Sequence, residues 1–185
     1  MGDIIDGTEK IVEGSPNPLF LPQSGAFRLA DYGTIDENGF VTGYYRSPTD
    51  MPWHNNDGRM DPIITEEIAA QIVTYAYAAR AGAQARDSED SELNPNFPLL
   101  TFETSKVWYH TGVMPKIADG PEIILTGQIT VDEKRKAGVA YTLYHKRANG
   151  EPLPIISGEI SAYKGSIALV RRSVRMLVER KMVQN

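Results

Sequence analysis

The sequence predicts an α+β fold in which an antiparallel sheet wraps around one buried helix, followed by a C-terminal amphipathic helix. Three observations support this fold class. A hairpin-like stretch at residues 27–46 precedes a single alanine-rich helical pattern at residues 63–83. Strand-like runs then fill residues 101–165, with explicit turn sequences between them. One apolar helix followed by a long meander suggests that the sheet curls around the helix.

The composition is that of an ordinary globular domain of 185 residues, with 41% hydrophobic and 23% charged residues. A formal net charge of −5 argues against nucleic acid as the main partner. The chain has no cysteine and only three scattered histidines, so we expect no metal site and no cofactor. No apolar run approaches the ~20 residues of a membrane span, and the acidic N-terminus lacks a signal core. We therefore expect a cytoplasmic protein with no membrane partner.

The first half of the chain divides into an arm, a hairpin and a loop. Residues 1–24 are rich in Gly, Pro and Asn and are expected to form an N-terminal arm, so that a single domain spans residues 25–185. Two alternating apolar runs follow around a DENG turn, in which Asn38-Gly39 supplies residues suited to positive φ, as is typical of a β-hairpin. Residues 47–62 contain three prolines and one glycine and predict a loop.

Two helices are expected. The central one, at about residues 63–83, is apolar around most of its circumference, so it should be buried and closely wrapped, and Gly82 suits its end. The second, at about residues 166–183, has apolar residues at helical spacing and basic residues on its other faces. One central helix cannot cover both faces of a sheet. The outer face therefore needs the terminal helix or a partner, and a homodimer is the economical expectation.

The junction between the loop and the central helix carries the chemistry. It reads PWHNNDGRMDPIITEEIAAQ and contains, in order, His54, Met60-Asp61-Pro62, Glu67 and Gln71. This segment and the order of elements resemble the hotdog fold, and more narrowly the β-hydroxyacyl-thioester (acyl-carrier-protein) dehydratases, of which the chain would be a divergent member. That family has a catalytic His in a Gly/Pro loop, a Met-Pro-Gly turn, and a buried helix with an acid and, four residues later, a Gln. The resemblance covers about residues 25–163.

The resemblance implies a dehydratase, or dehydratase/isomerase, acting on a β-hydroxyacyl thioester or polyketide-type intermediate carried by CoA or by an acyl carrier protein. His54 would remove the α-proton, and Glu67 would protonate the departing hydroxyl if burial keeps it protonated. In the family the two groups come from different subunits, so the site would require a dimer or dimer-based oligomer. Backbone N–H groups at the junction would polarise the thioester carbonyl.

The motif departs from the family at three points. The separation of His54 and Glu67 is one residue shorter. Ile63 replaces a Gly whose N–H helps to polarise the carbonyl, and its branched side chain crowds the approach. Asp61 adds a charge. The secondary candidates for the site are Glu66, Asp61, Gln71, Ile63 through its backbone N–H, and His110, which lies in an aromatic strand that could line an acyl pocket.

Each candidate also has an ordinary structural explanation. Glu66 and Glu67 could complement the helix N-terminus, Asp61 could be an N-cap, and Gln71 could be a buried amide bonded to the backbone. Two alternative functions therefore stay open. One is a hotdog thioesterase, with Glu67 or Asp61 activating water without His54, or a specialised natural-product tailoring cyclase. The other is a non-catalytic acyl-binding hotdog protein, which the Gly-to-Ile change favours.

Overall fold

The computed structural model describes residues 29–47, 57–82 and 98–166, together with five positions near the C-terminus: 168, 169, 172, 175 and 176. The expected N-terminal arm, residues 48–56 of the predicted loop, which include His54, and residues 83–97 lie outside the described residues. The five C-terminal positions are helical. The backbone N–H of Leu169 donates to Ser166 Oγ at 3.3 Å, an arrangement typical of a helix start. The rest of the expected terminal helix lies outside the described part.

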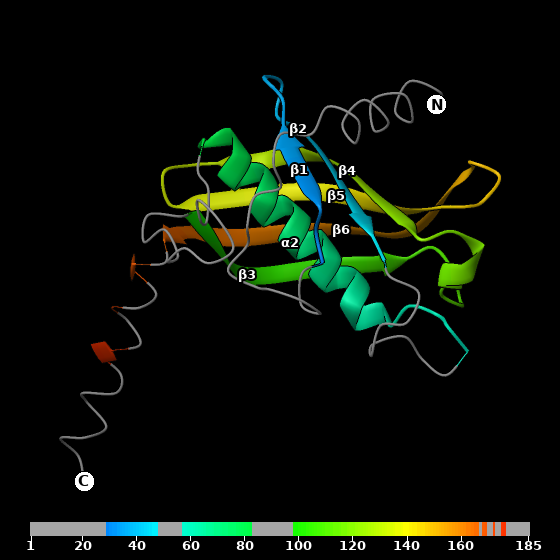
Figure 1. Ribbon diagram of the computed structural model, residues 1–185. Helices are drawn as coiled ribbons and strands as arrows, with labels where there is room; N and C mark the ends of the chain where they lie inside the picture. The colour runs from blue at the N-terminus through cyan, green and yellow to red at the C-terminus, as the bar shows by residue number, and fades with distance from the viewer. Residues whose placement is uncertain are drawn as a thin grey trace, which may run out of the picture.

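The described strands form one antiparallel sheet in the order β1-β2-β4-β5-β6-β3. Their bounds are β1 Tyr32–Ile35, β2 Phe40–Arg46, β3 Pro98–Tyr109, β4 Glu122–Asp132, β5 Lys136–Lys146 and β6 Pro152–Ser166. A short 3-10 helix, η2 (Ile117–Asp119), precedes β4. Helix α2 (Pro62–Arg80) lies across one face of the sheet (Figure 1). The hairpin, the central helix and the later meander are therefore confirmed.

Local sequence signals set both ends of α2. Asp61 is the N-cap, and its side chain accepts a hydrogen bond from the Ile63 backbone N–H. Pro62 occupies the first turn, where a missing N–H costs nothing. The helix ends at Arg80, three residues before the predicted end, and Gly82 follows with φ +63°. Glycine tolerates this left-handed conformation, so it stops the helix as expected.

The hairpin turn differs from the prediction in its geometry. Only Gly39 has positive φ (+78°), and no described residue other than glycine does, so Asn38 does not share that conformation. The Asp36 carboxylate accepts from the N–H groups of Asn38 (2.9 Å) and Phe40 (2.7 Å), and its carbonyl accepts from Gly39 N–H (3.1 Å). The side chain of Asp36 thus stabilises a three-residue loop with one left-handed glycine, in place of a two-residue turn that needs two such residues.

Helix α2 lies close against the sheet at a pair of glycines. Gly33 and Gly43 are directly opposite each other on β1 and β2. A Cβ on Gly33 would lie 2.5 Å from the backbone oxygen of Ile72, and one on Gly43 would collide with the Ile72 side chain. The two glycines therefore let the helix backbone lie directly on the first hairpin.

The two faces of the sheet differ in chemistry. Side chains toward α2 form the core, including Val41, Leu125, Leu143 and Ile156. The alternate residues point to the opposite face. Across four strands these include a row of hydroxyl side chains in register: Thr42, Thr126, Thr142 and Ser157. This row, called the outer hydroxyl row below, marks the face that α2 does not cover.

His145 is a buried structural residue with an incomplete set of hydrogen bonds. Its side chain lies near the end of β5 with 1% of its surface exposed. Nε2 is 2.5 Å from the Gly120 carbonyl oxygen, which can only accept, so Nε2 carries the proton. Nδ1 is buried without a partner. Burial, the largest cause, lowers the pKa of His145 below its ordinary 6.5, since a second proton would be charged and unpaired; Arg147 acts in the same direction.

The lowered pKa predicts a specific dependence of stability on pH. The unfolded chain takes up the His145 proton at higher pH than the folded chain. The contribution of His145 to the free energy of unfolding should therefore be complete above about pH 6.5. It should decline as the pH falls toward the folded-state pKa. His145→Gln keeps a donor for Gly120 but does not titrate. Urea denaturation at several pH values between about 5 and 7.5 gives the free energy of unfolding at each pH. This free energy should change less with pH in His145→Gln than in the wild-type protein. An equal dependence on pH in both proteins would contradict the assignment of His145 as a buried neutral residue.

Candidate active site

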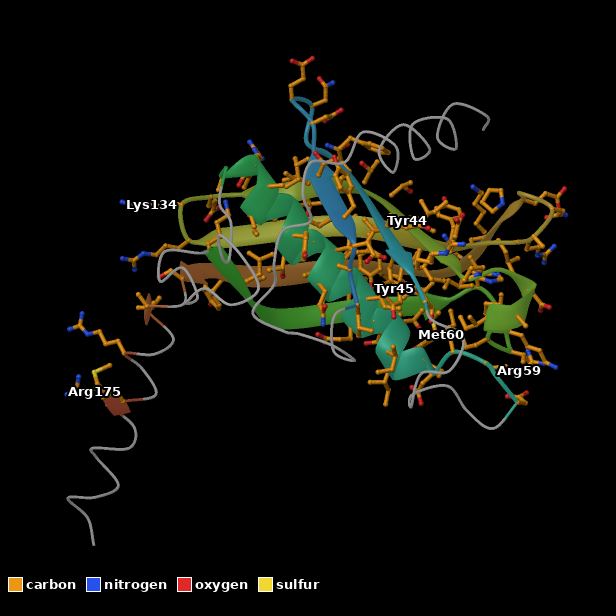
Figure 2. The ribbon with its side chains drawn as sticks, viewed as in Figure 1. Tyr44, Tyr45, Arg59, Met60, Lys134 and Arg175 are labelled. Carbon is orange, nitrogen blue, oxygen red and sulfur yellow. The ribbon has the colours of Figure 1, made fainter. Side chains whose placement is uncertain are left out.

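The chain just before α2 is fixed against the loop that follows β3. Arg59 forms an isolated bridge with Lys116, and its Nη1 donates to the Met114 carbonyl at 2.7 Å. The Met60 N–H donates to the Pro115 carbonyl at 3.4 Å, and Met60 is fully buried. Figure 2 shows Arg59 and Met60 at this end of the molecule, beside the start of α2. The segment that leads into the helix is therefore anchored to the loop between β3 and η2.

Asp61 and Ile63 bond to each other. The Ile63 N–H donates to Asp61 Oδ1 at 2.8 Å, so the N-cap explanation of Asp61 is confirmed. The Ile63 side chain is 75% exposed. The N–H that the resemblance assigns to carbonyl polarisation is thus already engaged. It would reach a substrate oxygen only by sharing its hydrogen or after Asp61 turns away.

Glu67 and Gln71 are also bonded, at the spacing of four seen in the sequence. Gln71 Nε2 donates to Glu67 Oε1 at 3.1 Å, and Gln71 Oε1 accepts from the Leu29 backbone N–H at 2.8 Å. Glu67 is exposed, whereas Gln71 is buried. The explanation of Gln71 as a buried amide bonded to the backbone is confirmed. The same amide also holds the Glu67 carboxylate on the helix.

Glu66 has a partner from a different element. The hydroxyl of Tyr109, the last residue of β3, donates to Glu66 Oε1 at 2.7 Å. This hydrogen bond, followed by burial, raises the pKa of Tyr109 to about 12. The phenol therefore stays protonated near neutral pH and acts as a donor to the carboxylate.

A second tyrosine lies near this pair. Tyr141 is buried, and its ring lies over Gly158 on the neighbouring strand: a Cβ there would be 2.6 Å from the Tyr141 hydroxyl oxygen. Burial is the main cause that raises the pKa of Tyr141, and the charge of Glu66 contributes. Two neutral phenols thus lie within electrostatic reach of one carboxylate.

His110 lies apart from the helix carboxylates. Its Nε2 is 2.7 Å from Ser157 Oγ, which is 2.8 Å from Thr142 Oγ1. Both hydroxyls belong to the outer hydroxyl row, on the face opposite α2. The structure therefore gathers Asp61, Ile63, Glu66, Glu67 and Gln71 on the first turns of α2, and it places the His110 ring on the other side of the sheet.

Comparison with known proteins identifies the fold. No protein-family model and no curated protein matches the chain. Among solved structures, the dehydratase heterocomplex ApeI:P from Xenorhabdus doucetiae is similar, with a TM-score of 0.61 and 11% identity over 86% of this chain and 98% of that one. A mutant 4-hydroxybenzoyl CoA thioesterase bound to 4-hydroxybenzoyl CoA has a TM-score of 0.50 and 8% identity over 68% of this chain and 84% of that one.

The chain has the hotdog fold. Its structural neighbours include a dehydratase and thioesterases. At these identities the likeness establishes the fold, and the activities named are those of the neighbours.

The sequence of this hotdog protein did not single out Tyr109 as a site residue. Alternation in β3 places Tyr109 on the same face as Val107, which packs against the core below α2. That alternation could have identified Tyr109 from the sequence, because it turns the Tyr109 side chain toward α2. It could not give the distance between Tyr109 and Glu66, which are 43 residues apart in the sequence.

Two further properties concern the described residues alone. None of the helices there is both long enough and apolar enough to cross a membrane. The same residues contain no group of three His, Asp or Glu side chains placed to hold a metal ion.

Proposed function

We propose that this hotdog protein is an enzyme that performs acid–base chemistry on an acyl thioester, and that it dehydrates a β-hydroxyacyl or polyketide-type thioester. The observation that supports the proposal is the pair of carboxylates on the first turns of α2, each held by a neutral donor. Glu67 accepts from Gln71 and Glu66 accepts from Tyr109. A carboxylate held by such a hydrogen bond is suited to proton transfer, because the donor restricts the orientation of the carboxylate.

In the proposed dehydration, His54 removes the proton from the α-carbon and Glu67 gives a proton to the β-hydroxyl. Glu67 is exposed in the single chain, so the burial that keeps it protonated would come from the bound substrate or from a second subunit. The carbon–oxygen bond breaks, water leaves, and a double bond forms between the α- and β-carbons. Ile63 and Val113 are exposed apolar side chains near the helix start and offer a surface for an acyl chain. CoA or an acyl carrier protein would carry the acyl group.

Thioester hydrolysis is the second candidate, and the Glu66–Tyr109 bond favours it. The Tyr109 hydroxyl holds Glu66 by Oε1, so the other oxygen of the positioned carboxylate could accept a proton from water. This reaction would not need His54.

We also propose that the chain works as a homodimer built along β3. In the described part of the sheet, β3 pairs only with β6, so its other edge is available to a strand from a second chain. The similar dehydratase ApeI:P is itself a heterocomplex.

A product assay on the full chain tests the proposal. The substrates are a 3-hydroxyacyl-CoA and the matched acyl-CoA without the hydroxyl, each in short- and medium-chain forms. Enoyl thioester and free thiol are both measured. We expect enoyl thioester from the hydroxylated substrate only, without thiol release. Glu67→Gln should lower the rate of enoyl thioester formation by about 10²–10⁴-fold. Thiol release from both substrates would support the hydrolase instead. Saturable binding with neither product would overturn enzymatic function and leave an acyl-binding protein.

A further inference from the structure

The hydrogen bond between Glu66 and Tyr109 joins two backbones that are each fixed. On the helix side, Asp61 caps α2, and Thr65 Oγ1 donates to the Asp61 carbonyl at 3.0 Å. On the strand side, the His110 N–H donates to the Ile155 carbonyl at 2.9 Å, which continues the pairing beyond the end of β3. The fold thus fixes the two backbones, and the hydrogen bond joins side chains that are partly exposed.

The two carboxylate oxygens of Glu66 differ in their hydrogen bonds. Oε1 accepts from Tyr109. No side chain or backbone group in the described part of the chain donates to Oε2. The phenol remains protonated near neutral pH, because the pKa of Tyr109 is about 12, so Oε1 stays occupied. Glu67 lacks this arrangement, since its donor Gln71 comes from the same helix and its side chain is exposed.

We propose that Tyr109 is a positioning residue that holds Glu66 by Oε1, so that Oε2 binds the water molecule that the reaction releases or consumes. This inference rests on the proposed function. In dehydration, Oε2 would accept a hydrogen bond from the departing water. In hydrolysis, Oε2 would take a proton from water as the water oxygen bonds to the carbonyl carbon, the C–S bond breaks, and the thiolate then takes that proton from Glu66.

Steady-state kinetics of a double-mutant cycle tests the proposal. Tyr109→Phe removes only the hydroxyl, and we expect kcat to fall roughly tenfold with KM within about twofold, because a hydrogen bond to a charged group is lost. Glu66→Gln should lower kcat further, and the double variant should be no slower than Glu66→Gln alone. Tyr163→Phe is the matched control: Tyr163 is 44% exposed, and it lies on β6 opposite Thr101 near the start of β3, whereas Tyr109 is the last residue of β3.

A second measurement does not depend on turnover. Titration of the Tyr109 phenol, followed by NMR of labelled tyrosine and assigned with Tyr109→Phe, should have its midpoint near 12 in the wild-type protein. In Glu66→Gln it should fall toward the ordinary 10, since the charged acceptor is gone. An unchanged midpoint would overturn the pairing.

The outcomes separate this inference from the proposed function. Turnover by the wild-type protein with an unchanged kcat in Tyr109→Phe overturns the positioning role and leaves the proposed function intact. Independent, additive losses in the cycle overturn it as well. Absence of both products with the wild-type protein overturns the proposed function and the catalytic part of this inference together.

Discussion

Gly43→Ala is expected to lower the free energy of unfolding by about 3 kcal/mol, at the upper end of the usual effect of overpacking a core. The added Cβ would collide with Cγ2 of Ile72, a fully buried residue on the face of α2 that packs on the sheet. Strand β2 cannot move freely away from the helix, because Gly43 is paired with Gly33 on β1 and with Leu125 on β4. The change is measured as a shift of the urea midpoint at constant slope.

Two further variants make this prediction specific. Gly112→Ala is the control, because an added Cβ there meets nothing within 4 Å and the residue lacks positive φ; we expect a change within about 0.5 kcal/mol. Ile72→Leu removes Cγ2 while keeping the side-chain volume. The double variant Gly43→Ala with Ile72→Leu should therefore be more stable than Gly43→Ala alone. A double variant that is as unstable as the sum of the single changes would refute the collision as the cause.

His54→Ala is expected to lower formation of the enoyl thioester by about 10²–10⁴-fold, the usual contribution of a general base. The expectation follows from the proposed dehydration, in which the neutral imidazole of His54 accepts the α-proton. The rate of enoyl formation is measured by mass spectrometry or absorbance, and the folded state of the variant is checked by its urea midpoint. If the protein hydrolyses thioesters instead, thiol release should stay within a few-fold of wild type.

His110→Gln provides the comparison. The His110 ring bonds to Ser157 on the face opposite α2, so its loss should leave enoyl formation nearly unchanged. A large loss in His110→Gln with little loss in His54→Ala would mean that the outer face, and not the helix start, holds the reacting groups.

Much of the fold follows from local patterns in the sequence. The alanine-rich run, the Asp61-Pro62 start and Gly82 place α2 to within three residues at each end, because caps and apolar periodicity act over a few residues. The strands of the meander follow from alternation and turn residues in the same way. The turn at Asp36 was less predictable, because the sequence fits both a two-residue and a three-residue loop. Hydrogen bonds to the Asp36 side chain stabilise the three-residue loop.

The candidate site was only partly predictable. The Glu67–Gln71 bond could be expected, because residues four apart on a helix face each other. The Ile63 N–H is bonded to Asp61 because Asp61 is the N-cap. The sequence was compatible both with this cap and with an Ile63 N–H that polarises a substrate carbonyl. The Glu66–Tyr109 bond could not be predicted, because it depends on how far β3 curls toward α2. That curvature is a property of the whole sheet and is not set by any short segment.

The position of Tyr109 would link the proposed chemistry to the proposed dimer. It ends β3, which lies at one edge of the sheet as far as the structure describes it. A strand added along that edge would restrict the backbone that carries the phenol. In the proposed dimer, binding of such a strand and binding of a ligand to Glu66 would be thermodynamically coupled, and each would alter the affinity for the other by the same factor. Affinity for ligand should consequently depend on protein concentration, even though the carboxylate itself belongs to a helix.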